Sequence, residues 1–155
     1  MEPARSHPPA PKPSLAKRLG LGADTRCLSI IGEAGHAWIA MGQPARARVA
    51  FEGLVSLTPD DPSGWLGLAQ VALDLSEWKQ AELAAAEATR RPYSTPATAA
   101  LGYLLRARAA MGMKKHKDAI RYLKTVVELE PKGELGNQAK SLIDRLSESR
   151  NPGPG

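Results

Sequence analysis

The chain has 155 residues, a net charge of +5, 43% hydrophobic residues and a single cysteine. A chain of this length can bury one core without disulfides or a structural metal. The lone Cys27 excludes an intramolecular disulfide and a cysteine-based zinc site, a pattern typical of a reducing compartment. No apolar run approaches the roughly 20 residues that span a bilayer, and prolines stand where a secretory signal needs apolar residues. We therefore expect a cytoplasmic protein with no membrane span and no metal.

The two ends of the chain differ from its middle. Five prolines fall within the first thirteen residues, and residues 1–27 hold five basic against two acidic side chains. Residues 1–23 are therefore predicted to be a disordered, proline-rich basic tail, and residues 149–155 a flexible tip. Because most of the excess positive charge lies near this tail, the net charge alone gives weak support to a nucleic-acid partner.

The middle of the chain has the pattern of helices. Ala, Leu, Glu and Lys dominate it, apolar residues recur at helical spacing, and six prolines separate the periodic stretches. Helices are expected at residues 24–41, 45–57, 63–75, 78–90, 95–111, 117–129 and 134–148. Seven helices joined by short turns predict an all-α array of antiparallel neighbours.

An internal repeat determines the expected architecture. A shift of thirty-four residues superposes positions of core type: Ala47 on Ala81, Ile31 on Trp65, and Trp38 on Ala72. That period is the length of one helix hairpin, and stacked hairpins bury a continuous core.

These positions resemble the tetratricopeptide repeat (TPR) family. The first repeat matches the family pattern at Gly35, Trp38, Ala47, Phe51 and Pro59; the second at Trp65, Leu68, Ala69 and Ala81; and the third at Ala119, Leu123 and Pro131. The resemblance implies a right-handed superhelical array of three TPR helix hairpins plus a C-terminal capping helix. The TPR domain would span residues 24–148, with repeats at about 28–61, 62–95 and 96–133 and the capping helix at 134–148.

Two details of this array are expected from the spacing. Trp65 is expected to be buried between hairpins. The turn at residues 112–117 is expected to be two residues longer than the family's turn, which leaves the register of the third repeat's first helix open.

The sequence offers little for catalysis. His7, His36 and His116 have no metal-ligand spacing, and no glycine-rich stretch has the context of a phosphate loop. We therefore expect no enzyme and no cofactor.

A binding groove is expected from the family's geometry, which places the first helix of each hairpin on the concave side. The resemblance assigns to this groove His36, Ile39, Leu66, Gln70, Leu73, Tyr103 and Arg106. The aliphatic members are equally consistent with plain core. The expected ligand is an extended segment of another protein rather than a small molecule.

Family knowledge narrows that ligand. TPR domains that bind the C-terminal carboxylate of chaperones use lysines, asparagines and an arginine for this contact. The matching places in this sequence hold Gly32, His36, Gly67 and Leu101, and only Arg106 matches, in one register. The carboxylate-binding set is therefore expected to be absent. The chain is instead similar to class II chaperones of type III secretion in its length, repeat count, final helix and the "WLGLA" stretch. That resemblance implies a bacterial secretion chaperone.

Other functions stay open from the sequence. A generic assembly scaffold fits the same architecture, and a homodimer is compatible with it. A basic patch from Lys114 to Lys124 could contact nucleic acid, although 5% aromatic residues provide few side chains for base stacking.

Overall fold

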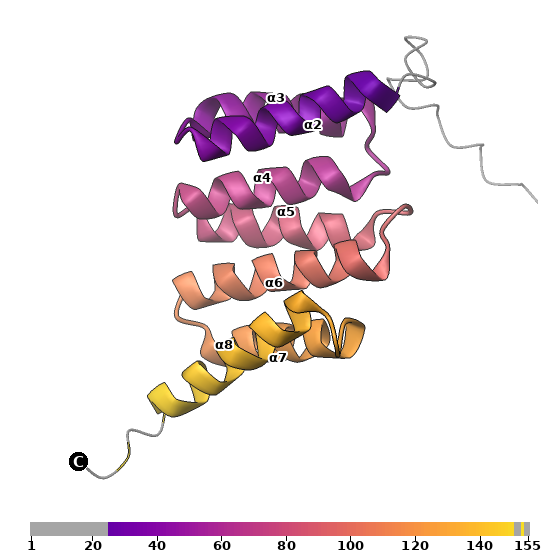
Figure 1. Ribbon diagram of the computed structural model, residues 1–155. Coiled ribbons are helices and arrows are strands. Elements are labelled where there is room, and N and C mark those ends of the chain that lie inside the picture. The colour runs from indigo at the N-terminus through magenta and orange to yellow at the C-terminus, as the bar shows by residue number, and fades with distance from the viewer. Residues whose placement is uncertain (1–24, 151–152, 154–155) are drawn as a thin grey trace, which may run out of the picture.

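The computed structural model describes residues 25–150 and 153, and this part of the chain folds into seven helices and no strands (Figure 1). The predicted tail at residues 1–23 lies outside the described residues. The helices are α2 (Thr25–Ala40), α3 (Pro44–Leu57), α4 (Pro62–Asp74), α5 (Trp78–Arg90), α6 (Pro96–Gly112), α7 (His116–Leu129) and α8 (Glu134–Arg150). The predicted all-α fold is confirmed, with helix bounds within two residues of those expected.

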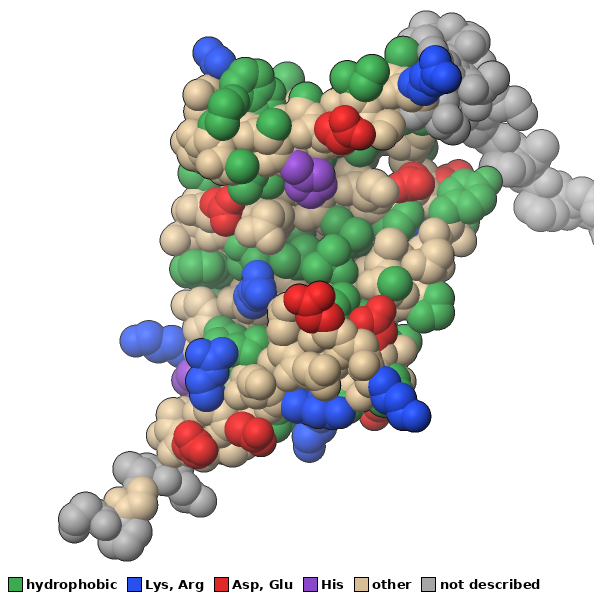
Figure 2. All heavy atoms as spheres, in the orientation of Figure 1, with side chains coloured by type: hydrophobic (Ala, Val, Ile, Leu, Met, Phe, Trp, Pro, Cys, Tyr) green, Lys and Arg blue, Asp and Glu red, His purple; other side chains and the backbone are tan. Residues whose placement is uncertain are grey.

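The helices pair into three hairpins, α2 with α3, α4 with α5 and α6 with α7, and α8 covers the last one. Helices α2, α4, α6 and α8 touch one another in succession, whereas α3, α5 and α7 contact only the helices before and after them. The hairpins therefore stack in two layers. We call the free side of α2, α4 and α6 the inner face, which is turned toward the reader in Figures 1 and 2, and the side of α3, α5 and α7 the outer face.

Local sequence explains where the helices begin. Proline occupies the first turn of α3, α4 and α6, where its missing N–H costs no hydrogen bond. The Asp61 side chain accepts a hydrogen bond from the Ser63 backbone N–H at 2.8 Å and so caps α4. Thr95 and Thr98 cap α6 reciprocally, each side chain accepting from the other's backbone N–H.

The turn inside each hairpin has the same geometry in all three repeats. Gly42, Ser76 and Lys114 adopt left-handed backbone conformations, with φ of 69°, 58° and 59°. The residue after each of them donates its backbone N–H to a helix carbonyl five residues back. The expectation of a longer turn at residues 112–117 is therefore wrong. The additional residues lie in α6, which has 17 residues where α4 has 13.

The first two hairpins join around one aromatic ring. Phe51 of α3 is 1% exposed, and it lies against Gly35 of α2 and Gly67 of α4. A Cβ atom on either glycine would fall within 3 Å of the ring, so only glycine permits this approach. The third hairpin and α8 enclose a larger aliphatic core around Leu104 and Leu123.

Within residues 25–150, no helix has both the length and the apolar character needed to cross a membrane.

Candidate functional site

The inner face is the first candidate site. Leu66, Gln70 and Leu73 are spaced four and three residues apart on α4, so they share one side of that helix. Figure 2 shows hydrophobic side chains gathered in the middle of this face, between α4 and α6, with charged side chains around them. Leu66 and Leu73 are half-buried and pack against the core between α4, α5 and α6. They therefore serve as core and present an edge to the inner face.

The polar residues expected in the groove keep accessible donors and acceptors. His36 is exposed on α2, and its ring lies edge-on to Phe51 with centroids 5.1 Å apart. The Gln70 amide donates to the Asp74 carboxylate at 2.9 Å. Ile39 is half-buried against the core of the first hairpin. The structure thus places His36, Ile39, Leu66, Gln70 and Leu73 on the inner helices α2 and α4, and their binding role stays a prediction.

The structure separates Tyr103 and Arg106 from the other expected groove residues. Arg106 donates from Nη2 to the Tyr122 hydroxyl of α7 at 3.1 Å, and it lies 4.0 Å from the Glu82 carboxylate of α5. The Tyr103 ring lies 6.3 Å from the Tyr122 ring. Both side chains point toward the outer helices, which differs from the expectation that they line the groove. The reason is their register: counted from the hairpin turns, Tyr103 and Arg106 occupy the places of Trp65 and Leu68, which line the outer side of α4.

Two inner-face residues of α6 were missed by the sequence analysis. Because the hairpin turns of the second and third repeats are thirty-eight residues apart, Arg108 and Met111 occupy the places of Gln70 and Leu73. Arg108 is exposed and forms no ion pair with the described residues, and Met111 is half-buried. The sequence does contain this register of α6, because Ala107 precedes Ala119 by twelve residues, as Ala69 precedes Ala81.

One cavity opens at the N-terminal ends of α2 and α4, with a volume of about 320 Å³. His36 and Gly32 line it together with the carboxylates of Glu33 and Asp61. The Ser29 hydroxyl donates to Glu33 at 3.1 Å. This end of the inner face is therefore polar and acidic, whereas its middle is apolar.

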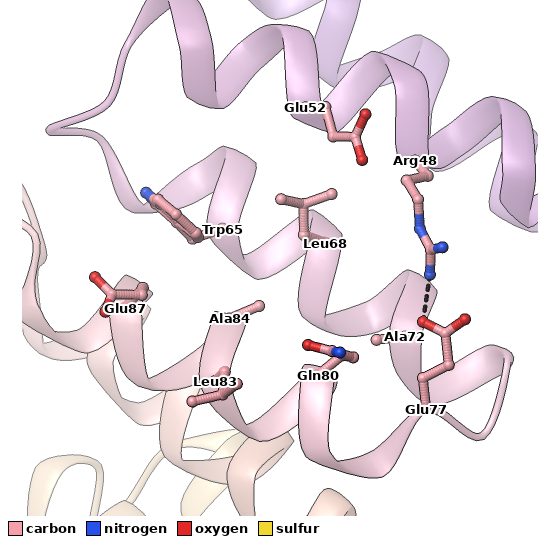
Figure 3. A pocket seen from close by; sticks show the side chains of 10 residues that line it. All are labelled: Arg48, Glu52, Trp65, Leu68, Ala72, Glu77, Gln80, Leu83, Ala84 and Glu87. Carbon is pink, nitrogen blue, oxygen red and sulfur yellow. Dashed lines mark hydrogen bonds and ion pairs between the residues drawn. The ribbon is translucent and has the colours of Figure 1, made fainter.

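A larger cleft, of about 540 Å³, lies on the outer face between α3 and α5 (Figure 3). Its floor is α4, which contributes Trp65 and Leu68. Trp65 is half-buried, so the prediction that it is buried between hairpins is wrong. Its ring lies at one end of this cleft, 5.4 Å from the Arg91 guanidinium. The Arg48–Glu77 ion pair, at 2.5 Å, closes the opposite end.

The basic patch from Lys114 to Lys124 is exposed but mixed in charge. Arg121 pairs with Asp118 at 3.2 Å on α7. Lys124 lines a shallow cavity of about 310 Å³ together with Glu128 and Asp144. Neighbouring carboxylates therefore reduce the positive potential of this surface. Among the described residues, no three His, Cys, Asp or Glu side chains gather in a way that could hold a metal ion.

Comparison with known proteins agrees with this architecture. Residues 33–95 match the tetratricopeptide repeat family. A comparison with curated protein sequences gave no match.

Solved structures share the fold at low sequence identity. A type III secretion system complex from Aeromonas hydrophila superposes with a TM-score of 0.76 at 16% identity, covering 90% of this chain and 91% of that chain. The translocator chaperone SycD of Yersinia enterocolitica gives 0.69 at 17% identity, covering 90% and 97%. The first TPR domain of Spaghetti (RPAP3), bound to the HSP90 peptide SRMEEVD, gives 0.66 at 20% identity, covering 79% and 91%.

The repeating hairpins, their two-layer stacking and the terminal helix define an all-α TPR array. The tetratricopeptide repeat family matches residues 33–95, and the TPR fold continues through the third hairpin and α8.

Proposed function

We propose that this chain is a non-catalytic module that holds an extended segment of another protein against its inner face, as a chaperone for a secreted protein. The observation that supports this function is the composition of the face itself. An apolar strip between α4 and α6 is flanked by His36, Gln70 and Arg108, whose polar groups remain accessible. Apolar surface supplies affinity for an extended peptide, and flanking donors and acceptors fix its register.

The solenoid is suited to this role because it is already folded before binding. Helices that pack on both neighbours do not need to reorganise, so little conformational entropy is lost by the protein when a peptide docks. Modest contacts spread along the inner face can then give useful affinity.

Similar structures support a protein ligand. SycD is a type III secretion translocator chaperone, and the Spaghetti domain binds a peptide of HSP90. The fold similarity to SycD extends over nine-tenths of this chain. An assembly scaffold would use the same face, so the experiment must test the face first and the chaperone role second.

The test of the face is a selection of peptides from a random phage-displayed library, followed by affinity measurement on synthetic copies. Gln70→Trp places a large ring on the inner face and is expected to weaken selected peptides at least tenfold. Lys79→Trp, at an exposed position of the outer helix α5, is the matched control and should leave affinity unchanged. Peptides that bind both variants equally well would refute inner-face binding.

The chaperone role has a separate test. Co-expression with the proteins encoded beside its gene is expected to keep one of them in solution as a stable complex. Loss of that complex in the Gln70→Trp variant would support the chaperone role, whereas neighbours that stay insoluble with the wild-type chain would favour the scaffold.

A further inference from the structure

The outer face has two successive junctions that can be compared position by position. Helix α4 forms the floor between α3 and α5, and α6 forms the floor between α5 and α7. The hairpin turns align residues of the second repeat with residues thirty-eight positions later. Tyr103, Arg106 and Tyr122 therefore occupy the places of Trp65, Leu68 and Ala84.

The second junction is filled by the protein's own side chains. Tyr122 is 7% exposed, and its hydroxyl donates to Glu82 of α5 at 2.8 Å. The Arg106 guanidinium lies 4.3 Å from the centre of the Tyr122 ring and also donates to its hydroxyl. An aromatic ring stacked with a guanidinium thus closes this junction.

The first junction lacks both of these groups. Ala84 stands where the ring would be, and Leu68 stands where the guanidinium would be. What remains is the open cleft of about 540 Å³, a volume within the range of ligand-binding pockets. Figure 3 shows Leu68 and Ala84 in the middle of the cleft, with Trp65 and Glu87 at one end and the Arg48–Glu77 pair at the other.

The charge and apolar surface of the rim point to a ligand of one kind. Glu77 is paired with Arg48, and Glu87 is paired with Arg90 and Arg91. Glu52 is exposed and has no ion pair with any described residue, so it is the carboxylate of the rim that can receive a cation. Leu83 is 58% exposed beside the cleft. A second cavity, which includes the 70% exposed Val49, continues past Glu52. This surface favours an apolar group accompanied by positive charge.

We propose that the outer cleft docks an aromatic side chain and a neighbouring basic side chain of a partner protein. The aromatic ring would occupy the space above Ala84 and contact Leu68 and Trp65, and the cation would face Glu52. The incoming pair reproduces the ring and guanidinium that Tyr122 and Arg106 supply at the next junction. Residues 1–24 are basic but contain no Phe, Trp or Tyr, so this segment lacks the aromatic half of the ligand.

The probe is the peptide acetyl-ARAYA-amide, in which Arg and Tyr are two residues apart and share one side of an extended chain. Titration into the full-length protein, followed by two-dimensional amide NMR, is expected to shift the signals of Leu83, Ala84 and the Trp65 indole. The peptide ARAAA and the peptide AEAYA should each bind at least fivefold more weakly. Equal binding by all three peptides, or shifts confined to the inner face, would overturn the proposal.

Protein variants test the same cleft independently. Ala84→Tyr fills the cleft from within and should weaken the probe at least tenfold, whereas Asn137→Tyr, on exposed α8, should not. Should Ala84→Tyr fail to fold, Glu52→Lys replaces an exposed side chain with no ion-pair partner and is expected to weaken the probe at least fivefold. Unchanged affinity in Glu52→Lys would refute the role assigned to the cation. Gln70→Trp should leave this binding intact, which distinguishes it from the inner-face function.

Two other occupants would overturn the proposal in recognisable ways. If residues 1–23 filled the cleft, their deletion would shift the Leu83 and Ala84 signals without any peptide and would strengthen the probe. If a second copy filled it through Tyr93, which is 70% exposed beside two arginines, those signals would move with protein concentration. The Tyr93→Ala variant would then abolish that dependence. A partner ligand predicts neither change.

Discussion

The substitution Gly67→Ala tests the contact that joins the first two hairpins. A Cβ atom on Gly67 would lie 2.2 Å from Cδ1 of Phe51, and one on Gly35 would lie 2.6 Å from Cζ of the same ring. Non-bonded carbon atoms prefer a separation of about 3.5–4.0 Å, so either the ring or helix α4 must move. The ring is 1% exposed and lies between Gly35 and Gly67, so it cannot move away from one glycine without approaching its other neighbours.

Two opposing effects determine the magnitude. Alanine in a helix interior is favoured over glycine by about 1 kcal/mol. Overpacking a filled core typically costs about 1 to 3 kcal/mol, and a contact this short on a rigid ring belongs at the upper end. We expect Gly67→Ala to lower the free energy of unfolding by about 1 to 2 kcal/mol. Gly53 on α3 has no atom within 4 Å of its Cβ position, so Gly53→Ala should raise that free energy by up to about 1 kcal/mol.

The assay is urea unfolding followed by far-ultraviolet circular dichroism on four proteins: the wild type, Gly67→Ala, Phe51→Leu and the double variant. Removing the ring should relieve the clash, so Gly67→Ala is expected to become neutral or stabilising in the Phe51→Leu background. The coupling energy should be at least about 1 kcal/mol. If Gly67→Ala stabilises the wild type as much as Gly53→Ala does, the close approach of α4 to Phe51 is wrong.

Three further changes probe other parts of the molecule. Trp65→Ala should cost about 2 kcal/mol in urea unfolding, less than the 3 to 5 kcal/mol of a fully buried tryptophan, because this side chain is half-buried; a larger loss would restore the expectation of full burial. Tyr122→Phe removes the hydroxyl that links Arg106 to Glu82 and should cost about 1 to 2 kcal/mol, and an unchanged midpoint would show that this link contributes nothing. The peptide SRMEEVD should show no binding in fluorescence anisotropy at about 100 μM, because Leu101 stands where TPR carboxylate clamps use a lysine; saturable binding would contradict that assignment.

The helices could be predicted from the sequence because prolines show where several of them begin. Pro44, Pro62 and Pro96 each occupy the first turn of a helix, and proline is excluded from helix interiors for steric reasons. The thirty-four-residue period then paired the helices into hairpins. Local sequence therefore determined the elements, and the repeat determined their neighbours.

The register of the third repeat could not be read from the same period, because α6 contains one more helical turn than α4. Four added residues rotate the start of a helix relative to its end by about 40° at 100° per residue. The hairpin turn at Lys114 fixes the register from the end of α6, and it puts Tyr103 and Arg106 at the places of Trp65 and Leu68 instead of at inner positions. Counting back from Ala119 identifies Arg108 and Met111 as the inner positions.

The outer cleft could not be predicted from the sequence, for a different reason. The cleft between α3 and α5 depends on which side chains of different hairpins lie next to one another over α4. The residue pattern within one helix does not show these contacts between hairpins. Ala84 resembles any small residue in a TPR helix, and only its spatial equivalence to Tyr122 shows what is missing there.

Helix α5 links the open and the filled junctions. Glu82 of α5 accepts the Tyr122 hydrogen bond on one side, while Ala84 and Glu87 of the same helix line the open cleft on the other. In a solenoid each interface contributes separately to stability, so a group that fills one junction strengthens mainly the two hairpins that meet there. Tyr122 and Arg106 supply such a group to the second and third hairpins. A ring and a cation bound above Ala84 would supply the same contact to the first and second hairpins, so a ligand there would stabilise the half of the array that the chain itself leaves less filled.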